Sequence, residues 1–248
     1  MRIDLAFATG ERDPAEFAGK TVVVIDVLRA SSTILTALAN GCPEVIPVAE
    51  PKEAFALAEK YGRDQVLLGG EREARKIRGF DLGNSPDEYG KEVVAGKKLI
   101  FTTTNGAKAF LEAAGAAEIL VGAFLNISRV CSYLKKEERE IFLFCAGRKG
   151  RLALEDLFCA GMIIDNLIFA AKDESVVELT DPARAGMLAY RQIAGMGPVV
   201  VALTQTDHGR YLASLGMASD LRYCGQVDLL PVLARLEAGG IILAAEED

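Results

Sequence analysis

Residues 22–33 run Val22-Val23-Val24-Ile25-Asp26-Val27-Leu28-Arg29-Ala30-Ser31-Ser32-Thr33, and this stretch decides the fold class. Four consecutive β-branched residues predict a strand that is apolar on both faces. Such a strand is typical of a sheet that helices cover on both sides. Residues 31–40 then predict a helix ended by Gly41, because glycine commonly terminates helices. The stretch therefore predicts one strand-to-helix unit of an α/β fold.

The same unit recurs along the first 170 residues. Strands that alternate with helices of 10–15 residues favour a largely parallel sheet between helices. We expect one domain over residues 1–248, with residues 173–181 as the best candidate for a boundary. The predicted strands are 3–7, 22–25, 45–49, 66–68, 98–102, 119–124, 141–145 and 198–203, and the predicted helices are 31–40, 51–61, 106–114, 128–136, 152–169, 182–194, 207–215 and 229–237.

Composition excludes several classes of protein. The net charge is −7 and no lysine or arginine run stands out, so we expect neither a nucleic-acid partner nor binding to an anionic membrane. The five cysteines form no C-x-x-C pair, which favours a reducing compartment. No apolar run is long enough to span a bilayer, and the N-terminus lacks the apolar core of a signal peptide. We therefore expect a cytoplasmic protein.

Polar residues follow the predicted strands where each strand ends. Open α/β sheets bind ligands at the carboxyl ends of their strands. The pattern thus predicts that segments far apart in the chain meet at one ligand site. The residues concerned are Asp26, Arg29, Glu71, Arg72, Thr102, Thr103, Thr104, Asn105 and Arg148.

Residues 79–86 (GFDLGNSP), with Gly69-Gly70-Glu71-Arg72 before them, combine glycines, carboxylates and small polar side chains. Glycines let a backbone approach a ligand closely, and carboxylates such as Glu71 and Asp81 suit Mg²⁺. The side chains of Arg72, Asn84 and Ser85 suit phosphate oxygens. The alternative is a solvent-facing cluster of ion pairs within the charge-rich residues 71–78.

Two helix starts are candidate anion sites. Ser31 or Ser32 is predicted to cap the helix at 31–40, with the first amides facing an anion. Thr102, Thr103 and Asn105 precede the helix at 106–114, where hydroxyl and amide groups suit phosphate or sulfonate. The alternative is that these are ordinary caps and strand residues.

Three further candidates come from the second half of the chain. Cys145 and Arg151 fit the C-x5-R spacing of cysteine phosphatases, although Cys145 also suits a buried strand end. His208, the only histidine, is a candidate general acid for a leaving alkoxide. Asp156 or Glu155 is a candidate ligand of a metal or water, and the helix dipole alone also favours acids there.

These blocks, in this order, resemble the 2-phosphosulfolactate phosphatase family. The resemblance rests on residues 26–33 (DVLRASST), 69–72 with 79–86 (GGER and GFDLGNSP), 102–106 (TTTNG) and 145–156 (CAGRKGRLALED). It implies a three-layer α/β/α fold with a mixed sheet. It also implies an Mg²⁺-dependent phosphatase that converts 2-phospho-3-sulfolactate to 3-sulfolactate and phosphate, in coenzyme M synthesis or a bacterial sulfolactate route.

On this interpretation Mg²⁺ lies among Asp26, Glu71 and Asp156, with Asp81 in reserve, and Arg29 and His208 assist catalysis. Either water held by the metal or Asp26 itself attacks phosphorus. Two alternatives stay open: a cysteine-dependent phosphatase using Cys145, and a non-catalytic protein that binds a small organic anion. The expected partner is a small anionic phosphorylated substrate, and a homo-oligomer is plausible.

Overall fold

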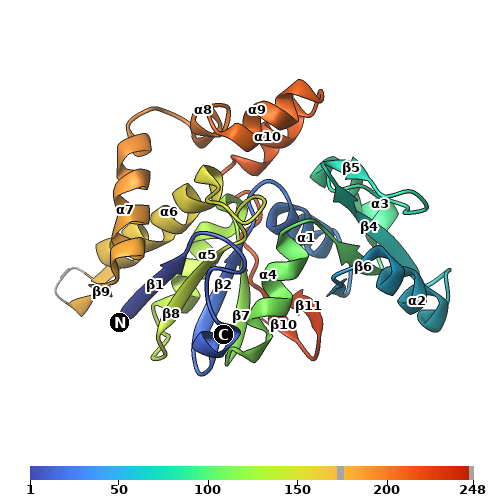
Figure 1. Ribbon diagram of the computed structural model, residues 1–248, viewed down its shortest axis with the longest axis horizontal. Helices are drawn as coiled ribbons and strands as arrows, with labels where there is room; N and C mark the ends of the chain where they lie inside the picture. Colours follow the sequence, from blue (N-terminus) through green and yellow to red (C-terminus); the bar gives the residue numbers. More distant parts are fainter. Residues whose placement is uncertain (172–175, 246–248) are drawn as a thin grey trace.

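The computed structural model describes residues 1–171 and 176–245, and their strands form one sheet with helices around it (Figure 1). Hydrogen-bonded neighbours follow the order β5-β4-β6-β3-β11-β10-β7-β2-β8-β1-β9. The strands are β1 (Arg2–Ala6), β2 (Thr21–Ile25), β3 (Val45–Pro47), β4 (Val66–Arg72), β5 (Arg75–Lys76), β6 (Lys98–Thr102), β7 (Glu118–Gly122), β8 (Ile141–Cys145), β9 (Glu178–Leu179), β10 (Ala234–Glu237) and β11 (Gly240–Leu243).

The sheet consists of two parallel groups that a hairpin joins. Strands β7, β2, β8 and β1 are parallel to one another, and so are β4, β6 and β3. Between the groups, β10 pairs antiparallel with β7 and β11 pairs antiparallel with β3, through one register pair each. The sheet is therefore mixed and largely parallel, which confirms the expected fold class.

Strand β2 shows why the sheet is covered on both faces. Val23 and Ile25 pack with residues of α5, α6 and α7, whereas Val22 and Val24 pack with residues of α1 and α4. All of β2 is buried, as a continuous apolar run requires. The helices are α1 (Ala30–Ala39), α2 (Pro51–Tyr61), α3 (Lys91–Val94), α4 (Gly106–Glu112), α5 (Ile127–Leu134), α6 (Leu154–Ala171), α7 (Asp181–Ala194), α8 (Val199–Leu203), α9 (Asp207–Ser214) and α10 (Ala218–Cys224).

Helices α1 and α4 pack against both strand groups at once. Their buried side chains share one core cluster with Val24 of β2 and with Phe101 of β6. Helix α2 covers the other face of the second group, around Leu68 and Ile100. The sheet thus bends around α1 and α4, and this bend brings the carboxyl ends of both groups to a common cavity. Helices α8, α9 and α10 lie above that end of the sheet (Figure 1).

Most predicted elements are confirmed, with ends shifted by a few residues, but two are wrong. Residues 199–203 form the short helix α8 and not a strand, and this segment packs in a core cluster with residues of α6, α7, α9 and α10. Residues 229–237 are not a helix: their last four residues form β10, which turns back into β11. Ala238 and Gly239 both have positive φ at this turn, as a two-residue hairpin requires.

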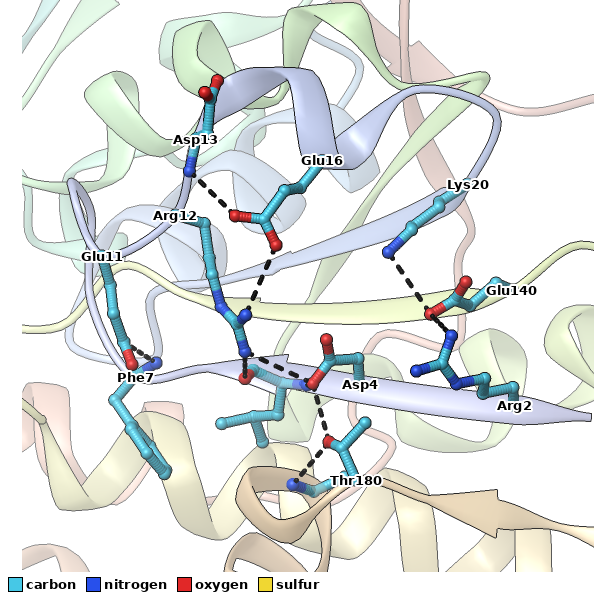
Figure 2. Close-up of polar contacts among 12 residues, drawn as sticks. Arg2, Asp4, Phe7, Glu11, Arg12, Asp13, Glu16, Lys20, Glu140 and Thr180 are labelled. Atoms are coloured by element: carbon cyan, nitrogen blue, oxygen red, sulfur yellow. Dashed lines mark hydrogen bonds and ion pairs between the residues drawn. The ribbon is translucent and has the colours of Figure 1, made fainter.

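A polar network surrounds β1, the strand next to the edge strand β9 (Figure 2). The carboxylate of Asp4 accepts hydrogen bonds from Leu5 N at 2.8 Å and from the hydroxyl of Thr180 at 2.7 Å. Thr180 is also the N-cap of α7. Arg12 lies between Asp4 and Glu16, at 3.5 Å and 3.4 Å. The network therefore ties the loop after β1 and the start of α7 to the same strand.

The expected single domain stays a prediction. Residues 172–175 lie outside the described part of the chain, so the candidate boundary at 173–181 falls partly outside it. Within residues 1–171 and 176–245, no helix has the length and apolar character needed to cross a membrane.

Close contact between α6 and α7 gives a test of the packing. A Cβ placed on Gly161 of α6 would lie 2.1 Å from the carbonyl oxygen of Gly186 in α7. Alanine favours a helix interior over glycine by about 1 kcal/mol, but this overpacking costs more. We predict that Gly161→Ala lowers the free energy of unfolding by about 1–3 kcal/mol, as measured by chemical denaturation.

The matched control is Gly195→Ala at the end of α7, where a Cβ would meet nothing within 4 Å and φ is −84°. We expect this variant to stay within about 0.5 kcal/mol of the parent protein. A Gly161→Ala variant as stable as the control would contradict the described contact between α6 and α7.

Candidate functional site

Asp26 lines a cavity where the two strand groups meet. It follows β2, and its Oδ1 accepts a hydrogen bond from Ala30 N, in the first turn of α1, at 3.1 Å. Its Oδ2 points at the start of α4, because a Cβ on Gly106 would lie 2.6 Å from that oxygen. Oδ2 has no hydrogen-bond donor among the described residues and is open to the cavity. Asp26 is therefore free to bind a ligand through one oxygen.

Burial raises the pKa of Asp26 from its ordinary 3.8 to about 6. The hydrogen bond from Ala30 and the charge of His208 oppose that shift, while Glu71 and Glu155 add to it. Asp156 lies deeper and accepts hydrogen bonds from Val27 N and Gly147 N at 2.8 and 3.1 Å. Burial and the neighbouring Asp26 raise the pKa of Asp156 well above its usual value. A bound cation at this place would relieve the crowding of negative charge.

Glu71, at the end of β4, also lines the cavity. Each of its oxygens already accepts a backbone hydrogen bond: Oε2 from Ala74 N at 2.7 Å and Oε1 from Thr104 N at 2.8 Å. Glu71 thereby joins the turn after β4 to the loop after β6, and a carboxylate keeps further lone pairs for a ligand.

Asn84 presents an unpartnered amide oxygen. Its Oδ1 is buried and has no hydrogen-bond partner among the described residues, while its backbone oxygen accepts a bond from Thr33 Oγ1 at 2.9 Å. Asn84 lines the cavity with Asp26. A buried oxygen without a partner is costly, so it indicates a missing ligand or water.

The loop after β6 reaches the cavity through Thr103, Thr104 and Asn105. Thr103 Oγ1 accepts a hydrogen bond from Ala107 N at 3.1 Å, so its side chain caps the first turn of α4. Asn105 Oδ1 accepts a hydrogen bond from Lys149 N at 3.3 Å. Thr102, by contrast, donates to Ala49 O at 3.0 Å and does not line the cavity.

His208 and Arg148 also line the cavity. His208 Nδ1 lies 3.1 Å from Glu155 Oε1, and both side chains are largely buried. The guanidinium of Arg148 stacks on the ring of Tyr211, 4.8 Å from its centroid. Helix α9 supplies both His208 and Tyr211, so this helix forms one side of the site.

Other predicted site residues bind protein groups around the cavity. Arg29 lines it, but its guanidinium is paired with the buried Asp220 of α10, which also accepts a bond from Ser85 Oγ at 2.7 Å. Arg72 donates to Ala49 O and to Thr102 Oγ1, at 2.9 and 3.1 Å. The structure therefore does not bring the side chains of Arg72 and Ser85 to the cavity.

The predicted serine cap is wrong. Helix α1 begins at Ala30 with Arg29 at the N-cap, so both serines lie in the first turn. Ser31 Oγ accepts a bond from Asp26 N at 3.0 Å, and Ser32 Oγ donates to Val27 O at 2.8 Å. They shape the turn that holds Asp26 and do not line the cavity.

The reserve metal ligand, Asp81, lies outside the cavity lining. Its carboxylate pairs with Arg63 at 2.5 Å and accepts a bond from Leu68 N at 2.8 Å. Within residues 1–171 and 176–245 no three His, Cys, Asp or Glu side chains form a cluster that could hold a metal. A set of four carboxylate ligands is therefore not assembled, although Asp26, Glu71 and the amide oxygen of Asn84 line one cavity.

Those three oxygen donors fit Mg²⁺. This ion needs few carboxylates, prefers hard oxygen ligands and keeps several waters. The unpartnered Oδ1 of Asn84 and the open Oδ2 of Asp26 are the observations that support the fit.

Cys145 is buried at the end of β8 and does not line the cavity. Burial raises the pKa of its thiol well above the ordinary value, with the negative charge of Asp156 adding to the shift. A cysteine nucleophile needs the opposite environment, one that stabilises a thiolate. The C-x5-R interpretation is therefore wrong for this thiol.

Comparison with known proteins adds independent evidence. Residues 7–239 match the family described as 2-phosphosulpholactate phosphatase. The chain belongs to this family. Similar proteins named "Probable 2-phosphosulfolactate phosphatase" occur in Caldanaerobacter subterraneus, 41% identical over 89% of each chain, and in Clostridium perfringens, 40% identical over 97% of this chain and 96% of the relative. A third, from Symbiobacterium thermophilum, is 40% identical over 92% and 96%.

Membership confirms the resemblance inferred from the motifs, and the family is one of phosphoric monoester hydrolases. The predicted site residues included Glu155 only as an alternative to Asp156 in binding a metal or water, and they missed Tyr211 and Asp220. Nothing local marked Tyr211 or Asp220, because their partners Arg148 and Arg29 are remote in sequence.

The raised pKa of Asp26 gives a test of stability against pH. The carboxyl group of Asp26 is harder to ionise in the folded protein than in the unfolded chain. Its ionisation therefore destabilises the fold by an amount that grows as pH rises from 3.8 to about 6 and then stays the same at higher pH. We predict that Asp26→Asn raises the free energy of unfolding of the metal-free protein at pH 8 by about 1–3 kcal/mol. At pH 4.5 the gain in the free energy of unfolding should be less than half of its value at pH 8. Denaturant titrations in the presence of a chelator measure both values, and a loss of stability at pH 8 would contradict the assignment.

Proposed function

We propose that this protein hydrolyses 2-phospho-3-sulfolactate to 3-sulfolactate and phosphate in an Mg²⁺-dependent reaction. The observation that carries the proposal is Asp26: a buried carboxylate with a raised pKa, at the starts of α1 and α4, in one cavity with His208 and Arg148. The names of the similar proteins from C. subterraneus and C. perfringens support the choice of substrate.

The chain's own groups suit a phosphoryl ester. The guanidinium of Arg148 brings positive charge to the cavity, and phosphoryl transfer relies mainly on positioning and electrostatic stabilisation. Asp26 holds the reacting side of the cavity, either orienting a water or attacking phosphorus itself. Glu71 and Thr103 fix the loops on either side of it.

Asp26, Glu71 and Asn84 are the residues we assign to hold the metal. When bound, Mg²⁺ offsets negative charge on the phosphoryl oxygens. Asp156 does not line the cavity and acts from beneath, holding the turns at Val27 and Gly147 through its two oxygens.

His208 is assigned as the general acid for the leaving alkoxide. The carboxylate of Glu155 binds its Nδ1, which leaves Nε2 to give up a proton. Leaving-group protonation of this kind contributes roughly 10²–10⁴ in rate.

The cellular setting follows from the same proposal. We infer a cytoplasmic enzyme, since the five cysteines are all free and buried. Its reaction would serve coenzyme M biosynthesis or a bacterial sulfolactate route. Because the chain has a net charge of −7, we expect a small organic anion as its partner and not a nucleic acid. Self-association is also part of the proposal.

Phosphate release tests the function. We predict release from 2-phospho-3-sulfolactate with Mg²⁺, loss of it with a chelator, and recovery when Mg²⁺ returns. Asp26→Asn should lower kcat by roughly 10²-fold or more, as for the loss of several kcal/mol of transition-state stabilisation. Cys145→Ser is the control and should keep its activity. If the folded protein binds the substrate but releases no phosphate, it is a binding protein and not a phosphatase.

A second prediction concerns the histidine. His208→Gln should lower kcat by roughly 10²-fold with little change in KM, and Glu155→Ala by a smaller factor, because Glu155 acts only through the imidazole. Asp207→Asn, at the exposed neighbour that pairs with Arg210, should leave kcat unchanged. Steady-state kinetics distinguish these outcomes. A normal kcat in His208→Gln would exclude His208 as the general acid.

A further inference from the structure

A second cavity adjoins the first and differs from it in charge. The two share Arg148, Lys149 and His208 in their linings, so they form adjoining parts of one site. The first contains the carboxylates of Asp26 and Glu71, whereas the second adds Arg151 and Arg210.

Two of the arginines lie directly opposite each other. Arg148 N donates to Arg151 O at 2.8 Å, and Arg151 N donates to Arg148 O at 3.1 Å. Lys149 and Gly150, both with positive φ, make the two-residue turn between them. Residues paired in this way project their side chains on one face of the ribbon, where like charges destabilise each other.

No acidic side chain among the described residues offsets these charges. Arg148 stacks on Tyr211, and neither Lys149 nor Arg151 has an ion pair within residues 1–171 and 176–245. The two carboxylates of the second cavity are already engaged: Glu155 binds His208, and Asp207 binds Arg210. Arg210 is therefore neutralised, and the other three cations are not.

We propose that this second cavity binds the sulfonate group of the substrate, through Arg151 and Lys149 with Arg148 at the boundary. The inference rests on the proposed function. Phosphate and sulfonate occupy adjacent carbon atoms of 2-phospho-3-sulfolactate, so a phosphoryl group beside Asp26 directs the sulfonate to the neighbouring cavity. An oxyanion between Arg148 and Arg151 turns a repulsive pair into a favourable one, since guanidinium groups bind oxyanions by charge-assisted hydrogen bonds.

The test compares two substrates and two variants. The unsulfonated analogue 2-phospholactate keeps the phosphate ester and the carboxylate. In Arg151→Gln, the ratio of kcat/KM for the sulfonated substrate to that for the analogue should fall roughly tenfold, through KM, which is the size expected for one charge-assisted hydrogen bond. Arg210→Gln removes a cation that lines the same cavity but is paired, so its ratio should stay within about twofold of the parent value.

A ratio unchanged in Arg151→Gln, or lowered as much in Arg210→Gln, overturns the sulfonate site while leaving the phosphatase intact. If the parent protein releases phosphate from neither compound, the proposed function fails instead. Calorimetry with 3-sulfolactate and lactate then decides the site: tighter binding of 3-sulfolactate that Arg151→Gln abolishes supports it, and equal binding of the two anions overturns it.

Discussion

The close approach of α4 to α1 is the constraint on which the site depends. Gly106 opens α4 beside the first turn of α1, and a Cβ there would lie 2.4 Å from Ala30 Cβ and 2.6 Å from Asp26 Oδ2. Helix α1 follows a strand of one parallel group, and α4 follows a strand of the other. Only because the two helices meet can Asp26 lie in one cavity with Glu71 and the loop after β6. The bend of the sheet and the chemistry of the cavity thus depend on the same contact.

Charge is divided within this acidic protein in a way that suits a polyanionic ligand. Burial raises the pKa of Asp26 and of Asp156, and the charge of Asp26 adds to the shift at Asp156, so this acidic side of the site is short of positive charge. Across the cavity, the turn at residues 148–151 carries cations in excess. A ligand that brings a divalent cation to one side and an oxyanion to the other satisfies both. Helix α9 carries His208, which lines both cavities.

Sequence reasoning was successful where local chemistry and burial agree. The apolar run of β2 and the glycine after α1 specified their elements, and residues at strand ends such as Asp26, Glu71 and Arg148 do meet. Sequence reasoning failed where contacts with residues remote in the sequence determine the local structure. The hairpin of β10 and β11 forms because it bridges the two parallel groups, and Arg29 is occupied by Asp220, 191 positions away. Ser31 and Ser32 were predicted to cap the helix and bind the substrate, but the structure shows that their hydroxyls hold the backbone of the turn at Asp26.

The most direct measurement is a crystal structure of the protein with Mg²⁺ and 3-sulfolactate. The account predicts one metal ion in the cavity with Asp26 Oδ2 and Asn84 Oδ1 among its ligands, and the product's sulfonate facing Arg151. A metal bound elsewhere, or a product that contacts neither Asp26 nor the turn at residues 148–151, would contradict it.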